Sequence, residues 1–287
     1  MHVRLKLREP NGLVIPKGPN FARAQTIQSD FDETQLRFRA PKHRASNGRP
    51  KEVLPKRSYQ LNDIYHLFRM YGDGNYEDAN HLEYYECFRR FWTFYGPWLT
   101  GRQAELQMDM TLIMPVNFDN EFSLYHPRAF EKLVSDYLIR IYGNGINPVT
   151  EGPSHMAPVN WQPLIQFPTP AARLDAVPTP GGIEHDITTW IFFTLSDNLL
   201  ASVSFEFNRI LNLPKEELDK RVSVETMAEL MNQIIDSFQL TLSDQAKQQQ
   251  QAALEGLEDT SVTKDFPPID WAALKDGPGH DQKKLKN

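Results

Sequence analysis

The stretch LQMDMTLIMPV, residues 106–116, alternates apolar with mostly polar side chains along its length. A period of two residues is the repeat of a β-strand that buries one face. We therefore expect a strand here, the clearest in the sequence, and we expect its apolar face to pack in the core. The side chains of that face are Leu106, Met108, Met110, Leu112, Met114 and Val116.

Two further runs predict a β-hairpin. DITTWIFFTL (186–195) and LLASVSFEF (199–207) flank the short connection SDN, which suits a tight antiparallel turn. The apolar faces are expected to hold Ile187, Ile191, Phe193 and Leu195 on the first strand, and Leu199, Ala201, Val203, Phe205 and Phe207 on the second. The other face of the second strand carries Ser202, Ser204 and Glu206, so we expect that face to contact water.

The segment CFRRFWTFYGPWLTG (87–101) is rich in aromatic residues, and their spacing is typical of a helix. Large apolar residues recur at three- and four-residue intervals, which predicts a helix over about 80–95 after the turn sequence YGDGNYEDAN. This stripe comprises Tyr84, Cys87, Phe88, Phe91 and Tyr95. We interpret it as core, and expect Trp92 and Phe94, which lie off the stripe, to form a second packing surface or an exposed patch.

Further helices are expected near 61–70, in HPRAFEKLVSDYLIRIYGNG (126–145), in SVETMAELMNQIIDSFQLTL (223–242) and over Gln245 to Leu257. Pro127 fits the first turn of the second of these helices, and Gly143 fits its C′ position. Ser223 suits an N-cap for the third. Short strands are expected at Val3 to Leu7 and around Gln35 to Phe38.

This order of elements predicts an α+β fold, in which helices pack on an antiparallel sheet, because no regular β-α-β alternation is present. We expect a long irregular N-terminal region and a C-terminal helix followed by a tail. The predicted divisions are a basic, loop-rich region at 1–58 that packs on the body or extends from it, an α+β core domain at 59–258 and a tail at 259–287 that wraps the surface or is disordered.

Composition limits the cellular setting. The 287 residues include one cysteine, Cys87, which cannot form an internal disulfide and which we expect to be a buried structural thiol. The first residues, MHVRLKLREPNG, alternate charged and apolar side chains, whereas a signal peptide needs a continuous apolar run. No stretch approaches the roughly 18–20 apolar residues of a membrane span. We therefore expect a cytoplasmic protein.

The charge is divided unevenly along the chain. Residues 1–60 hold 13 Lys and Arg against 5 Asp and Glu, whereas the remainder holds 18 against 32. The basic stretch RFRAPKHRASNGRPKEVLPKR (37–57) has two interpretations, a nucleic-acid arm or a solvated connection. It lacks the interleaved aromatic residues of a base-stacking surface, and the acidic body would repel phosphate, so we favour the connection and expect no nucleic-acid binding.

Local motifs of known chemistry are missing from the sequence. It contains no G-x-S-x-G, no G-x-x-x-x-G-K-[ST], no G-x-G-x-x-G and no H-E-x-x-H. The best catalytic candidates are the pair Ser154-His155 and the trio Glu184-His185-Asp186. Adjacent side chains alternate across a strand, which makes the trio a poor metal site, and YGDGNYED lacks the ligand order of an EF-hand. We therefore expect a binding protein with no catalytic residues, metal or cofactor.

Acidic residues in expected loops are the candidates for partner binding. Loop carboxylates can steer a basic partner and accept charge-assisted hydrogen bonds from its Arg and Lys side chains. The candidates are Asp73, Glu77, Asp78, Asp119, Glu121 and Asp197. The alternative for each is a solvated carboxylate that serves solubility.

Three stretches together resemble the immunity proteins of bacterial type VI secretion systems. They are CFRRFWTFYGPWLTG, MTLIMPVNFDNEFSLYHPRAFEKLVSDYLIRIYGNG and ITTWIFFTLSDNLL, and the resemblance spans roughly residues 80–210. It implies a non-enzymatic protein of bacterial competition that binds a cognate toxin effector and covers its active site. With the expected cytoplasmic location, the implied toxin is a nuclease, whose basic phosphate-binding cleft an acidic body can occupy. The resemblance assigns no residue roles, and an adaptor or chaperone of a secreted effector, or an unrecognised hydrolase, stays open.

Overall fold

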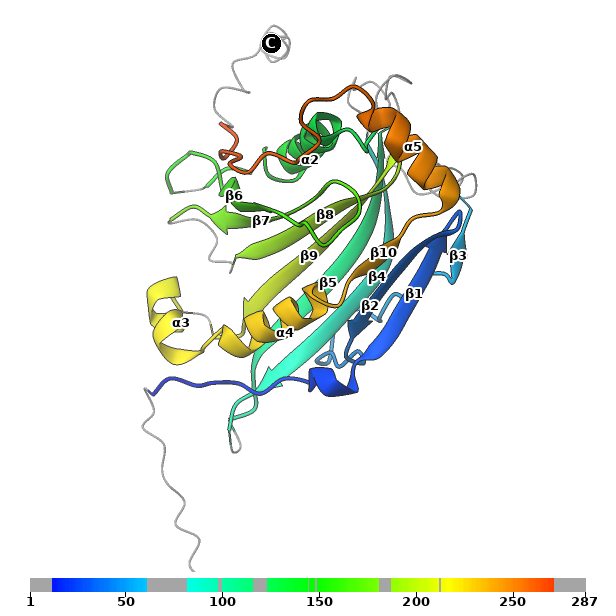
Figure 1. Cartoon of the computed structure of the whole chain (residues 1–287). Helices are drawn as coiled ribbons and strands as arrows, with labels where there is room; N and C mark the ends of the chain where they lie inside the picture. Colours follow the sequence, from blue (N-terminus) through cyan, green and yellow to red (C-terminus); the bar gives the residue numbers. More distant parts are fainter. Residues whose placement is uncertain are drawn as a thin grey trace, which may run out of the picture.

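The computed structural model describes residues 12–60, 82–97, 100–115, 123–143, 145–147, 149–180, 187–211 and 213–270 of the chain. Long antiparallel strands dominate these residues and helices pack on them, so the expected α+β class is confirmed (Figure 1). The expected strand Val3 to Leu7, the expected helix at 61–70 and the turn at 71–80 lie outside the described residues.

The larger sheet has six strands in the order β4-β5-β9-β8-β7-β6, and every neighbouring pair is antiparallel. Its strands are β4 (Leu82–Tyr95), β5 (Arg102–Pro115), β6 (His155–Pro163), β7 (Ala171–Pro178), β8 (Thr188–Ser196) and β9 (Leu199–Arg209). Strand β5 confirms the expectation from its period of two, and β8 and β9 confirm the expected hairpin, with Asp197 and Asn198 in the turn.

Strand β4 corrects the expected helix at 80–95. Aromatic residues have high strand propensity, but a β-bulge between Glu86 and Phe88 interrupts the alternation of β4. Cys87 and Phe88 consequently both reach the same core, and the apolar positions of the whole strand imitate helical spacing. Trp92 and Phe94, which fall off a helical stripe, are buried in that core. The expectation that the stripe is core is confirmed for Cys87, Phe88 and Phe91, whereas Tyr95 is 39% exposed and the predicted element was wrong.

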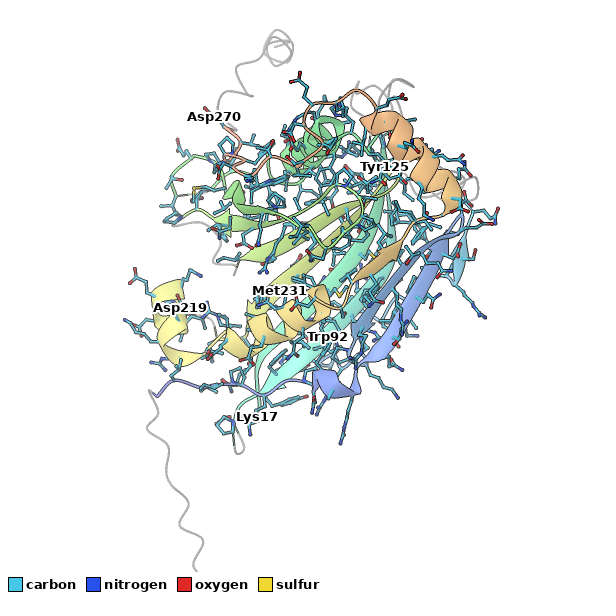
Figure 2. All side chains as sticks on the ribbon, in the orientation of Figure 1. Lys17, Trp92, Tyr125, Asp219, Met231 and Asp270 are labelled. Carbon is cyan, nitrogen blue, oxygen red and sulfur yellow. The ribbon has the colours of Figure 1, made fainter. Side chains whose placement is uncertain are left out.

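Two hydrophobic cores lie on the two faces of the larger sheet. One face packs against α4 (Glu225–Ile235) and the smaller sheet, and the opposite face packs against α2 (Pro127–Tyr142). Trp92 and Met231 lie in the first core, between β4 and α4 (Figure 2). The apolar face predicted for β5 belongs to this core from Leu106 to Met114.

The face of β9 that was expected to contact water is mostly buried. Ser202 and Ser204 are buried because α2 covers the sheet at this point, and the Ser202 hydroxyl donates to the Thr111 carbonyl at 3.3 Å. Only toward the end of the strand does a side chain of this face, Glu206, become exposed. An alternating sequence cannot reveal which distant helix will cover its polar face.

Side-chain spacing predicts an apolar face in each of the helices expected at 126–145 and 223–242, namely Phe130, Leu133, Val134, Tyr137, Leu138 and Ile141 in the first, and Met227, Leu230, Met231, Ile234, Ile235 and Phe238 in the second. All of these residues are buried except Ile141, which is 46% exposed. The second helix ends at Ile235, and Gln239–Thr241 form a short strand instead.

Helix α2 begins at Pro127 as predicted, but Gly143 ends it with φ −63° as the C-cap, not as the expected left-handed C′ residue. In α4 the predicted face is buried, and Ser223 Oγ accepts a hydrogen bond from Glu225 N although Val224 is the N-cap. Two further helices are α3 (Lys215–Arg221) and α5 (Asp244–Leu254), and a 3-10 turn η1 spans Phe21–Arg23. Among the helices of the described residues, none is long and apolar enough to cross a membrane.

The smaller sheet comes mainly from the N-terminal region. Its order is β10-β2-β1-β3, with β1 (Gln25–Phe31), β2 (Thr34–Ala40), β3 (Ser58–Tyr59) and β10 (Gln239–Thr241). The expected short strand at 35–38 is thus part of a longer β2. Phe38 of β2 stacks on Phe238, with ring centroids 4.7 Å apart, which ties this sheet to the segment after α4.

The basic segment at 37–57 covers the free edge of β4. An uncovered edge strand exposes a row of unpaired N–H and C=O groups that can pair with another chain. Here His43 Nδ1 accepts a hydrogen bond from Phe91 N at 3.2 Å. Backbone hydrogen bonds join the segment to β4 at two points. Arg44 bonds to Phe91 and Thr93 (2.9 Å each), and Val53 exchanges two bonds with Arg89 (3.0 and 2.9 Å). Lys17, earlier in the chain, exchanges two more with Tyr95 (2.7 and 3.0 Å). The segment therefore packs on the body, which is one of the two alternatives expected for 1–58, and its hydrogen bonds to β4 go beyond the interpretation as a solvated connection.

Arg90 fixes this cover from inside. Its side chain is buried, and Nη1 donates to the carbonyls of Ala40 (3.2 Å) and Pro41 (2.7 Å). Its Nε forms an ion pair with Glu52 at 3.2 Å. The Trp92 indole N–H also donates to Pro41 O, at 3.1 Å. Because carbonyls in this environment need donors, Arg90 is the group that holds the start of the basic segment on β4.

We predict that Arg90→Ala lowers the free energy of unfolding by about 3 kcal/mol, because it leaves two carbonyls without their charged donor. Urea denaturation followed by fluorescence measures this change. The control Lys247→Ala removes the exposed pair with Asp244 (2.8 Å) and should lower the free energy of unfolding far less than Arg90→Ala does. Equal effects of the two substitutions would show that Arg90 does not anchor the segment.

Candidate protein-docking site

Of the six acidic residues predicted to bind a partner, the structure describes one. Asp73, Glu77, Asp78, Asp119 and Glu121 lie outside the described residues. Asp197 lies in the turn between β8 and β9, where its carboxylate accepts a hydrogen bond from the Ser123 hydroxyl. Its backbone carbonyl accepts from Leu124 N at 2.7 Å. These contacts anchor the chain just before α2.

The first pair of candidate catalytic residues is brought together at the start of β6. Ser154 Oγ lies 2.9 Å from His155 Nδ1, and the ring of His155 packs on that of Tyr142 with centroids 4.7 Å apart. These contacts position an imidazole beside a hydroxyl, but they do not by themselves assemble a nucleophile, a base and an orienting acid. The trio Glu184-His185-Asp186 lies outside the described residues. Within the described ranges, no group of three or more His, Cys, Asp or Glu side chains could hold a metal ion.

A pair of carboxyl groups lies on the α2 side of the larger sheet, where sequence reasoning did not place one. Strand pairing sets Asp109 opposite Arg89, and Arg89 Nη2 donates to Glu86 (2.6 Å) while its Nε donates to Asp109 (3.1 Å). Gln107 Nε2 donates to Asp109 at 2.5 Å. Burial is the main cause that raises the pKa of both carboxyl groups, and the negative charge of Asp109 raises that of Glu86 further. Assigning 80–95 to a helix concealed this pair, because only a strand register brings the two residues together.

An acidic segment crosses the outside of α2 after α5. We call residues 255–270 the strap. Arg128 on α2 holds it, since Nη1 donates to both carboxylate oxygens of Glu131 (2.6 Å each) and to the Thr263 hydroxyl, while Nη2 donates to Asp259 and to Ser261 O at 3.2 Å each. The Thr263 amide in turn donates to Glu131 at 2.6 Å. Hydrogen bonds from Ser261, with a smaller effect of Arg128, hold the pKa of Asp259 below its ordinary value.

Apolar contacts continue the attachment of the strap toward β6. Val262 is buried in the core under α2, and the Trp161 indole N–H donates to Thr263 O at 2.7 Å. Phe266 packs on Trp161 with ring centroids 4.8 Å apart, and Ile269 N donates to Ala157 O at 2.9 Å. The strap thus runs from α5 to the outer edge of β6, and Asp270 lies at its far end (Figure 2). Residues 259–270 therefore wrap the surface, as one of the two expectations for the tail proposed.

A groove opens where the strap leaves α5. Its volume is about 360 Å³, and it lies between the β6–β7 loop, α5 and the strap. The walls are mostly apolar, with Ile165 and Phe167 on the loop, Leu254 on α5, Val262 on the strap and Tyr125 ahead of α2. Tyr125 is seen beside α5 in Figure 2. Apolar concavities with a polar rim are typical of binding sites.

The helix and the strap that border this groove carry an excess of acidic residues, although the charged residue among its lining is Lys264. Residues 244–270 hold six Asp and Glu against two Lys. Glu255, Glu258 and Asp265 are exposed, and no described cation pairs with them. The loop sequence PLIQFPTP carried a signal that sequence analysis overlooked, namely large apolar residues in a proline-rich connection.

No family model, curated protein or solved structure matches the chain significantly.

We predict that Asp109→Asn stabilises the protein more at pH 7 than at pH 4. Burial raises the pKa of the Asp109 carboxyl in the folded protein above its value of 3.8 in the unfolded chain. As the pH rises from the unfolded pKa through the folded pKa, the unfolded chain loses its proton first, so the folded state becomes less stable relative to it. Asparagine carries no such proton. Thermal unfolding of both proteins across pH 3.5 to 7.5 measures the difference, and a constant difference would contradict the raised pKa.

We also predict that Arg128→Ala frees the strap. Amide hydrogen exchange in 259–269 should become at least about tenfold faster, because Glu131 keeps a buried charge and loses its cation. Mass spectrometry of the exchanged protein resolves this segment. The control Lys132→Ala removes an exposed pair on the same helix and should leave the exchange unchanged, whereas unchanged exchange in Arg128→Ala would show that apolar contacts alone hold the strap.

Proposed function

We propose that this chain is an immunity protein that binds a cognate toxin of a bacterial type VI secretion system and covers its active site. In this proposal it acts in the cytoplasm by shape and negative potential. The sequence resemblance suggests the biological role, and the acidic, ordered strap suggests how the contact is made.

The single observation that carries the proposal is that the strap holds exposed carboxylates on an anchored backbone, whereas several cations of the basic N-terminal region are used in the fold. Cations of the basic N-terminal region contribute to the fold. Arg49 pairs with the buried Glu105 at 2.5 Å, and its guanidinium also lies over Phe91. By contrast, Glu255, Glu258 and Asp265 point to solvent from a backbone that Arg128 and Val262 hold in place. The strap thus presents carboxylates without a described ion pair on an anchored backbone, where a partner can reach them.

A basic toxin is the partner that this surface fits. Fixed carboxylates attract Lys and Arg over distances up to the Debye length, roughly 8 Å at physiological ionic strength, and therefore raise the association rate. A nuclease presents such cations in the cleft that binds phosphate. An acidic strap can occupy that cleft where the substrate would lie, which explains neutralisation without any chemistry in the immunity protein.

The proposal predicts rescue from a specific toxin. Co-expression of the chain with the toxin encoded beside its gene should restore growth, and the purified proteins should form a complex that weakens as salt increases. A purified complex in which the toxin keeps full activity would support an adaptor or effector chaperone instead. Failure of both rescue and binding would exclude the immunity role.

We predict that the double variant Glu255→Lys, Glu258→Lys weakens this complex by about tenfold or more, mainly through slower association. The matched control Glu216→Lys, Glu229→Lys reverses two exposed carboxylates on α3 and α4 and should change the affinity little. Figure 1 shows α3 and α4 far from the strap. Surface plasmon resonance at two salt concentrations compares them, and a larger effect of the control pair would move the contact to the other end of the molecule.

A further inference from the structure

We propose that the groove beside Ile165 is the anchor point of the contact, and that it receives an apolar side chain flanked by Lys or Arg in the partner protein. This inference rests on the proposed function, because it specifies which side chains of the toxin the immunity protein would bind in the groove. It adds an apolar element to what charge alone would provide.

The β6–β7 loop is held rigid beneath its exposed tip. Leu164 N donates to Ala171 O at 2.9 Å and closes the loop, and Phe167 N donates to Leu164 O at 3.2 Å. The ring of Phe167 stacks on Phe193 of β8 with centroids 4.9 Å apart. Thr169 adds a hydrogen bond from its hydroxyl to Thr194 O at 2.9 Å. A loop fixed in this way loses little conformational entropy when a partner binds.

Ile165 is the exception in this anchored loop, because it is 95% exposed. Leu164 and Phe167 of the same loop are buried in the first core, so Ile165 differs from them in facing solvent. An isoleucine displayed on a rigid turn beside an apolar groove forms a surface that a partner can desolvate completely. Such central apolar contacts supply most of the binding energy in protein interfaces.

The opposite wall of the groove is equally well fixed. Gln250 of α5 donates from Nε2 to Pro168 O at 2.5 Å and connects the helix to the loop. Tyr125 is fully buried, and its hydroxyl donates to Leu195 O at 3.3 Å. The resulting space of about 360 Å³ suits one or two apolar side chains and is too small for a folded element.

The charges beside the groove determine which residues of the partner fit next to the inserted apolar side chain. Glu255 follows the lining residue Leu254 directly, and Glu258 lies two positions before the lining residue Thr260, whereas Asp259 between them is already paired with Arg128. Lys264 is the one cation among the lining residues of this groove. An apolar residue with basic neighbours therefore fits, while nucleic acid and anionic lipid meet mainly repulsion.

The test uses the full chain with its isoleucine δ1-methyl groups labelled with carbon-13, and two acetylated, amidated peptides as probes. The peptide GKRLFKRG carries the proposed chemistry, and GEELFEEG has the same apolar centre with reversed charge. We expect the basic peptide to shift the Ile165 methyl resonance in a saturable manner, and the acidic peptide to bind at least about tenfold more weakly. Equal binding of the two peptides, or saturable shifts confined to other isoleucines, would overturn the proposal.

Two variants complete the experiment. Ile165→Asp changes an exposed side chain, so the fold should persist, and it should abolish peptide binding and weaken the toxin complex by about tenfold. Ile146→Asp, at an isoleucine that is 60% exposed in another loop, should do neither. If the peptide binds at Ile165 but no toxin is neutralised, the proposed function fails and the groove stands. If the toxin is neutralised equally by Ile165→Asp, the function stands and the groove is excluded as the anchor.

Discussion

The hydrogen bonds along the outer edge of β4 are the constraint on which the rest of the structure depends. A strand of this length at the edge of a sheet must be covered or it pairs with other chains. The cover is made by the backbones of Lys17, Arg44 and Val53, and buried Arg90 holds the start of that segment in place. The described part of the N-terminal region is thereby attached to the body of the protein.

This commitment has an electrostatic consequence at the other end of the chain. Part of the positive charge at 37–57 serves internal contacts, such as Arg49 with Glu105 and Arg90 with Glu52, whereas the strap keeps its carboxylates at the surface. The strap is held in place because Arg128 bonds to Glu131 and Asp259 together and because its own Val262 is buried in the core beside α2. A negative surface that is already ordered binds a basic protein without the entropic cost of folding a flexible tail.

Much of the fold follows from local patterns, and its departures have identifiable causes. The period of two in β5 and the apolar faces of α2 and α4 needed only side-chain spacing, because each element buries one continuous face. The helix expected at 80–95 failed because a bulge at Cys87 shifts the alternation of a strand buried on both faces. The burial of Ser202 depends on α2, which is distant in sequence, so the local pattern of β9 could not predict it.

The candidate site was harder to predict than the fold, because it is assembled from segments far apart in the sequence. Sequence reasoning sought acidic loops, and of those residues the described part of the chain includes Asp197, which contacts Ser123. It expected a helix and a tail after residue 245, but it could not foresee that the β6–β7 loop would meet them and display Ile165. Strand register likewise created the Glu86 and Asp109 pair from residues assigned to different elements.

The most direct test of the central claim is amide hydrogen exchange of the full chain with and without its cognate toxin. If the protein acts through the acidic strap and the groove beside it, protection on binding will concentrate in 163–170 and 254–265. Protection confined to the basic segment at 37–57, or to the α3 and α4 end of the molecule, would contradict that claim.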